Sequence, residues 1–177
     1  MRNLVDRGLN VVAVATNRPS CGGAAFAREM GIPLGELSQK AFASAEARDS
    51  AMCDFFLTHG VELVVDAGYD RVHTQPFLEP FAGRIINIHP SLLPDFGGGM
   101  DAVERALDSG ATTTGATAHV VTADLDAGPI LVQESVPILK GDTVEALRNR
   151  VHEAEYRILP QAIQLMEARL AKSASIG

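Results

Sequence analysis

The sequence predicts an α/β fold with an open, mostly parallel sheet and helices on both of its faces. Short apolar runs alternate along the chain with segments of helical periodicity, which is the order expected of strands and helices in such a fold. Several of the apolar runs are continuous, and continuous apolar strands are typical of parallel sheets that are covered on both faces.

The first half of the chain supplies three of the predicted strands. Residues 11–16 (Val-Val-Ala-Val-Ala-Thr) indicate a buried parallel strand. Glycines bound the two helices that follow, since the helix at 23–30 is expected to end at Gly31 and the helix at 45–59 at Gly60. The next strand, a helical turn and a further strand are expected at 63–67, 75–81 and 84–88.

The second half is predicted to contain a short helix, two strands and a closing helix. Asp142 and Glu145 fit the cap and the third helical position of a capping-box variant, so the closing helix should begin at Asp142. It runs towards Leu170, and Pro160 should kink it. The two strands could form an antiparallel addition to the sheet. The short helix and the two strands are expected at 102–107, 114–121 and 130–136.

Composition and charge exclude several classes of protein. A chain of 177 residues suits one domain, spanning 1–177, and its formal net charge of −7 argues against a nucleic-acid groove. Cys21 and Cys53 form no CxxC pair, so we expect two reduced thiols and no metal site. Apolar runs are too short to cross a bilayer. We therefore expect a cytoplasmic protein that binds neither nucleic acid nor membrane.

The strand at 84–88 leads into two polar side chains. Asn87 and His89 are two residues apart, so both can face the same crevice. A carboxamide donates hydrogen bonds to an oxyanion, an imidazole can do so or move a proton, and Asp126 in a later loop could orient that imidazole. In the alternative interpretation, Asn87 caps the loop, His89 is a structural histidine and Asp126 is a solvated turn residue. The neighbouring Asp124 is interpreted as solvated.

Two further features follow less directly from the residues. Gly97, Gly98 and Gly99 precede a helix and could cradle a phosphate, but they fit no phosphate-binding motif and Asp101 would repel the anion. A flexible loop is the favoured interpretation. His119 lies between apolar neighbours and is interpreted as half-buried or lining a pocket.

Taken together, these residues resemble the folate-dependent formyltransferases, and among them the phosphoribosylglycinamide formyltransferases. The resemblance runs from about residue 11 to 170 and implies a Rossmann-like formyltransferase fold. Its main motifs are Gly-Tyr-Asp-Arg-Val, His-Pro-Ser-Leu-Leu-Pro, Gly-Ala-Thr-x-His, Asp-x-Gly-Pro and Glu-Ala-Glu-Tyr-Arg, at 68–72, 89–94, 115–119, 126–129 and 153–157. The implied reaction moves a formyl group from 10-formyltetrahydrofolate to the amino group of glycinamide ribonucleotide.

The resemblance also implies roles for individual residues. Asn87 and His89 would stabilise the tetrahedral oxyanion, and Asp126 would orient His89 and help a water relay the amine proton. Glu155 would meet the ribose hydroxyls of the nucleotide. No metal is implied, and a homodimer is a possible assembly. The residues expected against the folate are Arg71, Val72 and Asp124.

Three departures from the family pattern qualify these expectations. The family begins with a strand and a phosphate-gripping Gly-Ser-Asn-type loop, whereas residues 1–8 look like the end of a helix, so we expect an N-terminally truncated chain or a misplaced start. Ala45 stands where an arginine often pairs with the folate tail, and Lys40 or Arg48 could replace it. The loop at 96–100 is one residue longer than usual.

Two other functions remain open at this point. A formyltetrahydrofolate hydrolase would use water in place of the amine, but that family usually has a second histidine where this chain has Pro90. A vestigial folate-binding protein with little activity is the third possibility, because the phosphate loop is missing.

Overall fold

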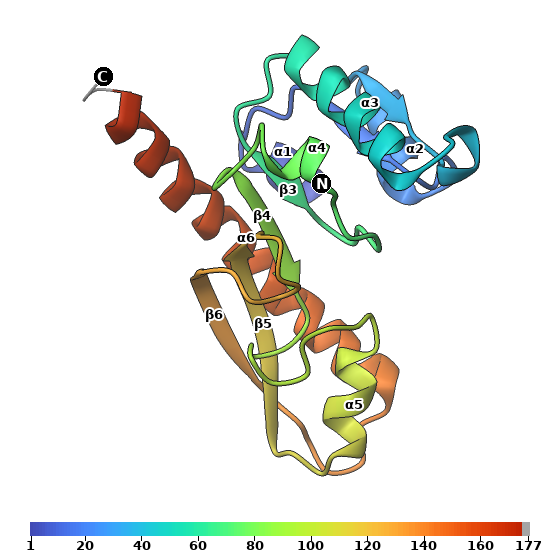
Figure 1. The fold of residues 1–177 in the computed structure, drawn as a ribbon. Coiled ribbons are helices and arrows are strands. Elements are labelled where there is room, and N and C mark those ends of the chain that lie inside the picture. Colours follow the sequence, from blue (N-terminus) through green and yellow to red (C-terminus); the bar gives the residue numbers. More distant parts are fainter. Residues whose placement is uncertain (175–177) are drawn as a thin grey trace. The chain divides into compact units, whose positions relative to one another are not determined.

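The computed structural model describes residues 1–174. The described chain divides into two compact units (Figure 1). The first contains residues 1–64 and 71–82, and the second contains residues 65–70 and those from 83 onward. One domain over 1–177 stays a prediction. Within the described residues, no helix is both long and apolar enough to span a bilayer.

The first unit is built from short helices and a two-stranded parallel sheet. Strand β1 pairs with β2 so that Val14 lies opposite Leu34. The elements are α1 (Arg2–Asp6), β1 (Val14–Thr16), α2 (Gly22–Glu29), β2 (Leu34–Glu36), the 3-10 turn η1 (Gln39–Ala41), α3 (Ala45–Thr58) and α4 (Gln75–Leu78).

The first predicted strand is shorter and less buried than expected. The prediction of a buried strand over 11–16 was wrong in extent, because β1 covers three residues and only Thr16 among them is buried. β1 belongs to a sheet of two strands, so few neighbours cover it. β2 was not predicted. Its Gly35 lies against α3, where an added Cβ would approach the ring of Phe55 to 3.1 Å.

The buried carboxylate of Asp49 pairs with its neighbour Arg48 in α3 and also ties α3 to the start of α4. Asp49 is fully buried, and its Oδ1 accepts hydrogen bonds of 2.8 and 2.6 Å from Arg48. Its Oδ2 accepts from the backbone N–H and the hydroxyl of Thr74, at 2.6 and 2.9 Å. Both carboxylate oxygens are thus occupied, which is what a buried charge requires.

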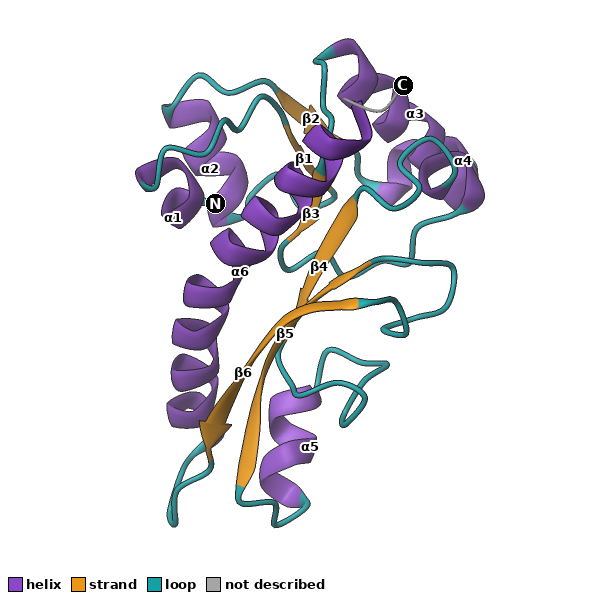
Figure 2. Cartoon of the chain, turned by 90° about the vertical axis from the view of Figure 1, so that its left-hand side faces the viewer, coloured by secondary structure: helices purple, strands orange, loops and turns teal. Residues whose placement is uncertain are grey.

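The second unit contains a four-stranded sheet in the order β3-β4-β5-β6 (Figure 2). β4 and β5 are antiparallel, as are β5 and β6, so the late antiparallel addition is confirmed. Helix α6 packs against β4, β5 and β6, and α5 packs against β5 and α6. The elements are β3 (Val64–Asp66), β4 (Ile85–His89), α5 (Ala102–Asp108), β5 (Thr113–Val120), β6 (Ile130–Pro137) and α6 (Val144–Ala174).

The closing helix begins later than predicted. Thr143 rather than Asp142 caps it, because the Thr143 hydroxyl accepts from the N–H of Ala146 at 3.2 Å. Asp142 instead binds Arg150 through two hydrogen bonds of 2.9 Å, and these lower the pKa of its carboxyl to about 2. Pro160 lies inside α6, as predicted.

Candidate active site

The end of β4 and the facing residues of β5 place three polar side chains together in the second unit. In this antiparallel ladder Asn87 lies opposite His119, and His89 lies opposite Thr117. His89 is 5% exposed and His119 is 2% exposed, whereas Asn87 is half-buried. The strand register therefore brings His119 to Asn87 and His89, although His119 lies 32 residues from Asn87 in the sequence.

Hydrogen bonding fixes which ring nitrogen of His119 carries the hydrogen, and it fixes the orientation of the Asn87 amide. Nδ2 of Asn87 lies 3.1 Å from Nε2 of His119, and Nδ1 of His119 lies 3.1 Å from the carbonyl oxygen of Val120. An amide nitrogen only donates and a carbonyl only accepts, so Nε2 must accept and Nδ1 must carry the hydrogen. Burial lowers the pKa of His119, which favours this neutral form.

Asp126 lies between the two imidazoles. Its Oδ2 is 3.5 Å from Nδ1 of His89 and its Oδ1 is 3.6 Å from Nε2 of His119, with 9% of the side chain exposed. These distances are within ion-pair reach but too long for good hydrogen bonds. The backbone of Asp126 has φ of 52°, a left-handed conformation that aspartate tolerates better than most residues.

The glycine-rich segment after β4 contacts both groups of the predicted catalytic pair. Nε2 of His89 lies 3.1 Å from the carbonyl oxygen of Phe96, and the N–H of Gly98 donates to Oδ2 of Asp126 at 2.8 Å. Arg105 on α5 donates to the same Phe96 carbonyl at 2.6 Å. The glycines favoured as a flexible loop therefore lie against the site.

A buried threonine fixes the start of that segment. The hydroxyl of Thr117, on β5, donates to the carbonyl of Ser91 at 2.7 Å. It accepts from the N–H of Leu93 at 3.1 Å and from the amide of Gln133 at 2.8 Å. One hydroxyl thus holds the chain just after His89, which restricts where the imidazole can point.

Two motif glycines permit close packing around the site. A Cβ on Gly115 would lie 2.2 Å from the carbonyl oxygen of Glu134 and 2.6 Å from Leu92. A Cβ on Gly128 would lie 1.8 Å from the carbonyl oxygen of Val120. Neither contact is possible for a larger residue, so both glycines are required by the close approach of neighbouring chain.

The remaining predicted site residues lie elsewhere. Asp124 is exposed, in agreement with its interpretation as a solvated residue. Arg71 and Val72 are exposed residues of the first unit, and their contact with folate stays a prediction. Glu155 lies on α6 with 16% of its side chain exposed, and burial raises its pKa to about 7.

His119 and Arg105 are the residues whose importance the sequence did not reveal. His119 was interpreted as half-buried or lining a pocket, whereas it is 2% exposed and lies opposite Asn87 in a paired strand. Its place in the Gly-Ala-Thr-x-His motif could have marked it. Arg105 acts on backbone carbonyls, which leave no pattern in a sequence. No cluster of three or more potential metal-ligating His, Cys, Asp or Glu side chains is present in residues 1–174.

This arrangement suits acyl transfer without a covalent intermediate. Asn87 and His89 bring N–H donors to the end of β4, where a developing oxyanion could be stabilised. Asp126 is a largely buried carboxylate close to His89, and it could orient the ring and accept a proton. The neutral His119 contributes by holding the Asn87 amide.

Comparison with known proteins agrees with this chemistry. The sequence model of the family described as formyl transferase matches residues 2–163. The trifunctional purine biosynthetic protein adenosine-3 of Bos taurus is 41% identical over 157 residues, which cover 89% of this chain but 15% of that protein. Phosphoribosylglycinamide formyltransferase of Mycobacterium tuberculosis is 39% identical over 168 residues, covering 92% of this chain and 77% of the relative.

Solved structures show the same fold. Glycinamide ribonucleotide transformylase 1 of Symbiobacterium toebii superposes with a TM-score of 0.85 at 43% identity, covering 89% of this chain and 74% of that one. Phosphoribosylglycinamide formyltransferase of Streptococcus pneumoniae gives 0.88 at 30% identity, covering 93% and 91%. These likenesses confirm the predicted fold class, and the chain belongs to the formyl transferase family.

Proposed function

We propose that this chain transfers the formyl group of 10-formyltetrahydrofolate to the amino group of glycinamide ribonucleotide. Membership of the formyl transferase family supports the reaction type. The relatives named phosphoribosylglycinamide formyltransferase, which the chain matches over most of its length, support the acceptor. The observation that carries the proposal is the cluster of Asn87, His89, His119 and Asp126 at the end of β4.

Each step of the reaction has a group to serve it. The amine nitrogen attacks the formyl carbon and the carbonyl electrons move to oxygen, where N–H donors of Asn87 and His89 stabilise the charge. Asp126, acting through a water, passes the amine proton to N10 of the folate. The C–N10 bond then breaks, giving tetrahydrofolate and the formylated nucleotide.

The residues that contact the substrates are proposed in less detail than those that act on the reacting atoms. Arg71 and Val72 in the first unit, and Asp124 in the second, are each candidates for contact with the folate. Glu155 would bind the ribose hydroxyls, and its raised pKa of about 7 means that it could either donate or accept there near neutral pH.

A three-way assay tests the proposal. Purified protein is given 10-formyltetrahydrofolate with and without glycinamide ribonucleotide, and tetrahydrofolate release is followed. Turnover that requires the nucleotide is expected. Turnover without it would indicate the hydrolase, and binding without turnover would indicate a folate-binding protein, so either result would refute the transfer reaction.

Two substitutions test the assigned residues. His89→Ala and Asp126→Ala should each remove most of the turnover, because each deletes a group that acts on the reacting atoms. His59→Ala, which changes a histidine of the first unit, serves as the control and should keep turnover near wild type. Near-normal rates in both site variants would contradict the assignment.

A further inference from the structure

Both ring nitrogens of the catalytic histidine face acceptor groups of the protein in this structure. Nδ1 of His89 faces Asp126 at 3.5 Å, and Nε2 faces the carbonyl oxygen of Phe96 at 3.1 Å. The side chain is 5% exposed. An N–H that donates to a protein carbonyl is not available to a substrate oxygen, so formyl transfer requires the contact with Phe96 to break.

The same segment also occupies Asp126. The N–H of Gly98 donates to Oδ2 of Asp126 at 2.8 Å. The segment therefore offers a carbonyl acceptor to the histidine and an N–H donor to the carboxylate. The substrates would offer the same pair of groups, since a formyl carbonyl must face His89 and an amine must face the Asp126 carboxylate or its water.

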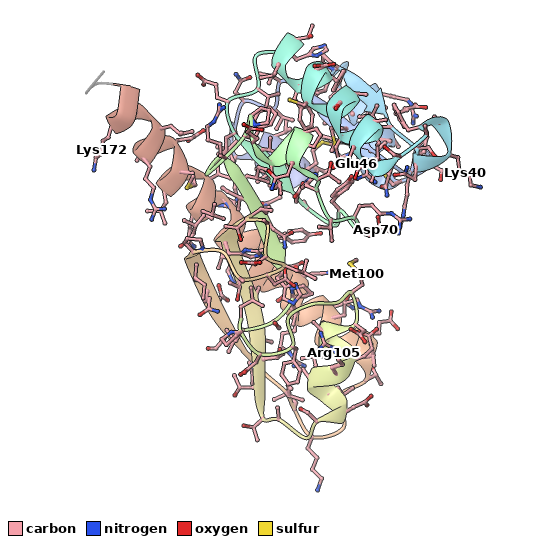
Figure 3. The ribbon with its side chains drawn as sticks, viewed as in Figure 1. Lys40, Glu46, Asp70, Met100, Arg105 and Lys172 are labelled. Atoms are coloured by element: carbon pink, nitrogen blue, oxygen red, sulfur yellow. The ribbon has the colours of Figure 1, made fainter. Side chains whose placement is uncertain are left out.

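Arg105 holds this segment in place. Its Nη2 donates to the carbonyls of Phe96 and Gly97 at 2.6 and 3.0 Å, and its Nε donates to Asp101 at 3.0 Å. Figure 3 shows Arg105 on α5, near the loop that carries Met100. A guanidinium that binds two consecutive carbonyls fixes the backbone between them, and charged donors make the stronger hydrogen bonds.

The backbone of the segment opposes this arrangement. Phe96 has φ of 56°, which is unfavourable for a residue with a large side chain, whereas Gly98 adopts its φ of 80° without strain. Gly97 lies close to Leu93, where an added Cβ would be at 3.1 Å. The conformation therefore depends on the hydrogen bonds to His89, Asp126 and Arg105.

We propose that residues 96–98 act as an internal substrate mimic, which closes the catalytic site until substrate displaces it, and that Arg105 is the latch that sets how readily it opens. The inference rests on the proposed function for its consequence in catalysis. The observed affinity for the formyl donor is then reduced by the fraction of molecules that are open, so weakening the latch should improve it.

Chemical modification tests the closed state without any substrate. Diethyl pyrocarbonate carbethoxylates accessible imidazole nitrogens, and the modified histidine is located by peptide mass spectrometry. In Arg105→Ala the modification rate at His89 should rise about tenfold, which corresponds to about 1.4 kcal/mol. The rate at His119, which is equally buried and hydrogen-bonds to Asn87 and Val120 rather than to the segment, should stay unchanged. Arg148→Ala removes another arginine ion pair of α5, that with Glu104, and should leave both rates unchanged.

A second variant should act in the opposite direction. Phe96→Asn places a residue that tolerates positive φ at the strained position, so the closed state should gain stability and His89 should react more slowly. Equal changes in both variants, or no change in either, would overturn the proposal. A parallel rise at His89 and His119 in Arg105→Ala would also overturn it, because it would report general loosening.

Kinetics test the consequence for the proposed reaction. Arg105→Ala should lower the KM for 10-formyltetrahydrofolate about tenfold, and Phe96→Asn should raise it. A higher KM in Arg105→Ala would show that the arginine binds substrate and would refute the latch. If wild-type protein transfers no formyl group, the proposed function fails, whereas the carbethoxylation rates still decide whether the segment closes the site.

Discussion

Replacing His119 with glutamine or with asparagine separates the two hydrogen bonds that this residue makes. A glutamine side chain reaches the position of Nε2, where its oxygen can accept from Asn87 as the imidazole does at 3.1 Å. An asparagine side chain reaches only the position of Nδ1, where its amide can donate to the carbonyl of Val120. Only the glutamine variant should keep the Asn87 amide aimed correctly.

The size of the effect follows from the structure. Each variant loses one neutral hydrogen bond, so both should unfold with free energies about 1 kcal/mol below wild type. The loss of kcat should be smaller than the about 10²–10³-fold that follows removal of an oxyanion donor, because Asn87 is still present. We expect about a tenfold fall in kcat for His119→Asn, equivalent to about 1.4 kcal/mol, and a kcat within about threefold of wild type for His119→Gln.

Steady-state kinetics and urea unfolding of the two variants measure these quantities. The decisive comparison repeats His119→Asn in an Asn87→Ala background, where the second change should cost nothing further in kcat because the amide it orients is gone. Equal kcat in the two single variants, or an additive loss in the double variant, would refute the positioning role of His119.

The remaining predictions concern stability. Thr117→Val should lower the free energy of unfolding by about 1–3 kcal/mol, because it leaves the buried N–H of Leu93 without its acceptor. The matched Thr114→Val, at an equally buried hydroxyl with no hydrogen-bond partner among the described residues, should change it by less than about 0.5 kcal/mol; equal effects in urea would contradict this. Asp49→Ala should cost about 3–5 kcal/mol, since it leaves Arg48 buried without its carboxylate. The raised pKa of Glu155 means that the folded state binds more protons than the unfolded state between pH 4.5 and about 7. The stability that this group contributes is therefore full below pH 4.5 and is lost as the pH rises towards 7, by up to about 3 kcal/mol. Glu155→Gln should remove that part of the pH dependence of the free energy of unfolding. A variant with the same pH profile of unfolding as wild type would refute this prediction.

Elements with strong local signals could be predicted from the sequence, whereas those defined by their neighbours could not. α3 was placed to within a residue because a glycine closes it, and the structure shows that Ser44 caps its other end. β1 was predicted too long because the length of an apolar run does not show how many strands will lie beside it in the sheet. β2 escaped notice because three residues that include Gly35 carry no periodicity, and their pairing with β1 is what makes them a strand.

The candidate site shows the same division between side chains and backbone. Asn87, His89 and Asp126 could be proposed because their side chains carry the chemistry. The carbonyl of Phe96 and the N–H of Gly98 could not, because every residue has such groups and only the fold shows which of them face a catalytic side chain. The cap of α6 was wrongly assigned to Asp142 for a related reason. Asp142 pairs with Arg150, which becomes its neighbour only once the helix has formed, so the sequence does not show this pairing.

The contrast between Asp126 and Asp124 shows what makes a carboxylate part of this site. The two residues are of the same type and lie two positions apart, yet Asp124 is exposed and Asp126 lies between two imidazoles. The difference comes from Gly128. A Cβ at this position would lie 1.8 Å from the carbonyl oxygen of Val120, so only glycine lets the loop return this close to β5. Because Val120 adjoins His119, this close return places Asp126 at the imidazoles. The glycine of Asp-x-Gly-Pro is therefore as necessary to the site as its aspartate, and it acts through the backbone alone.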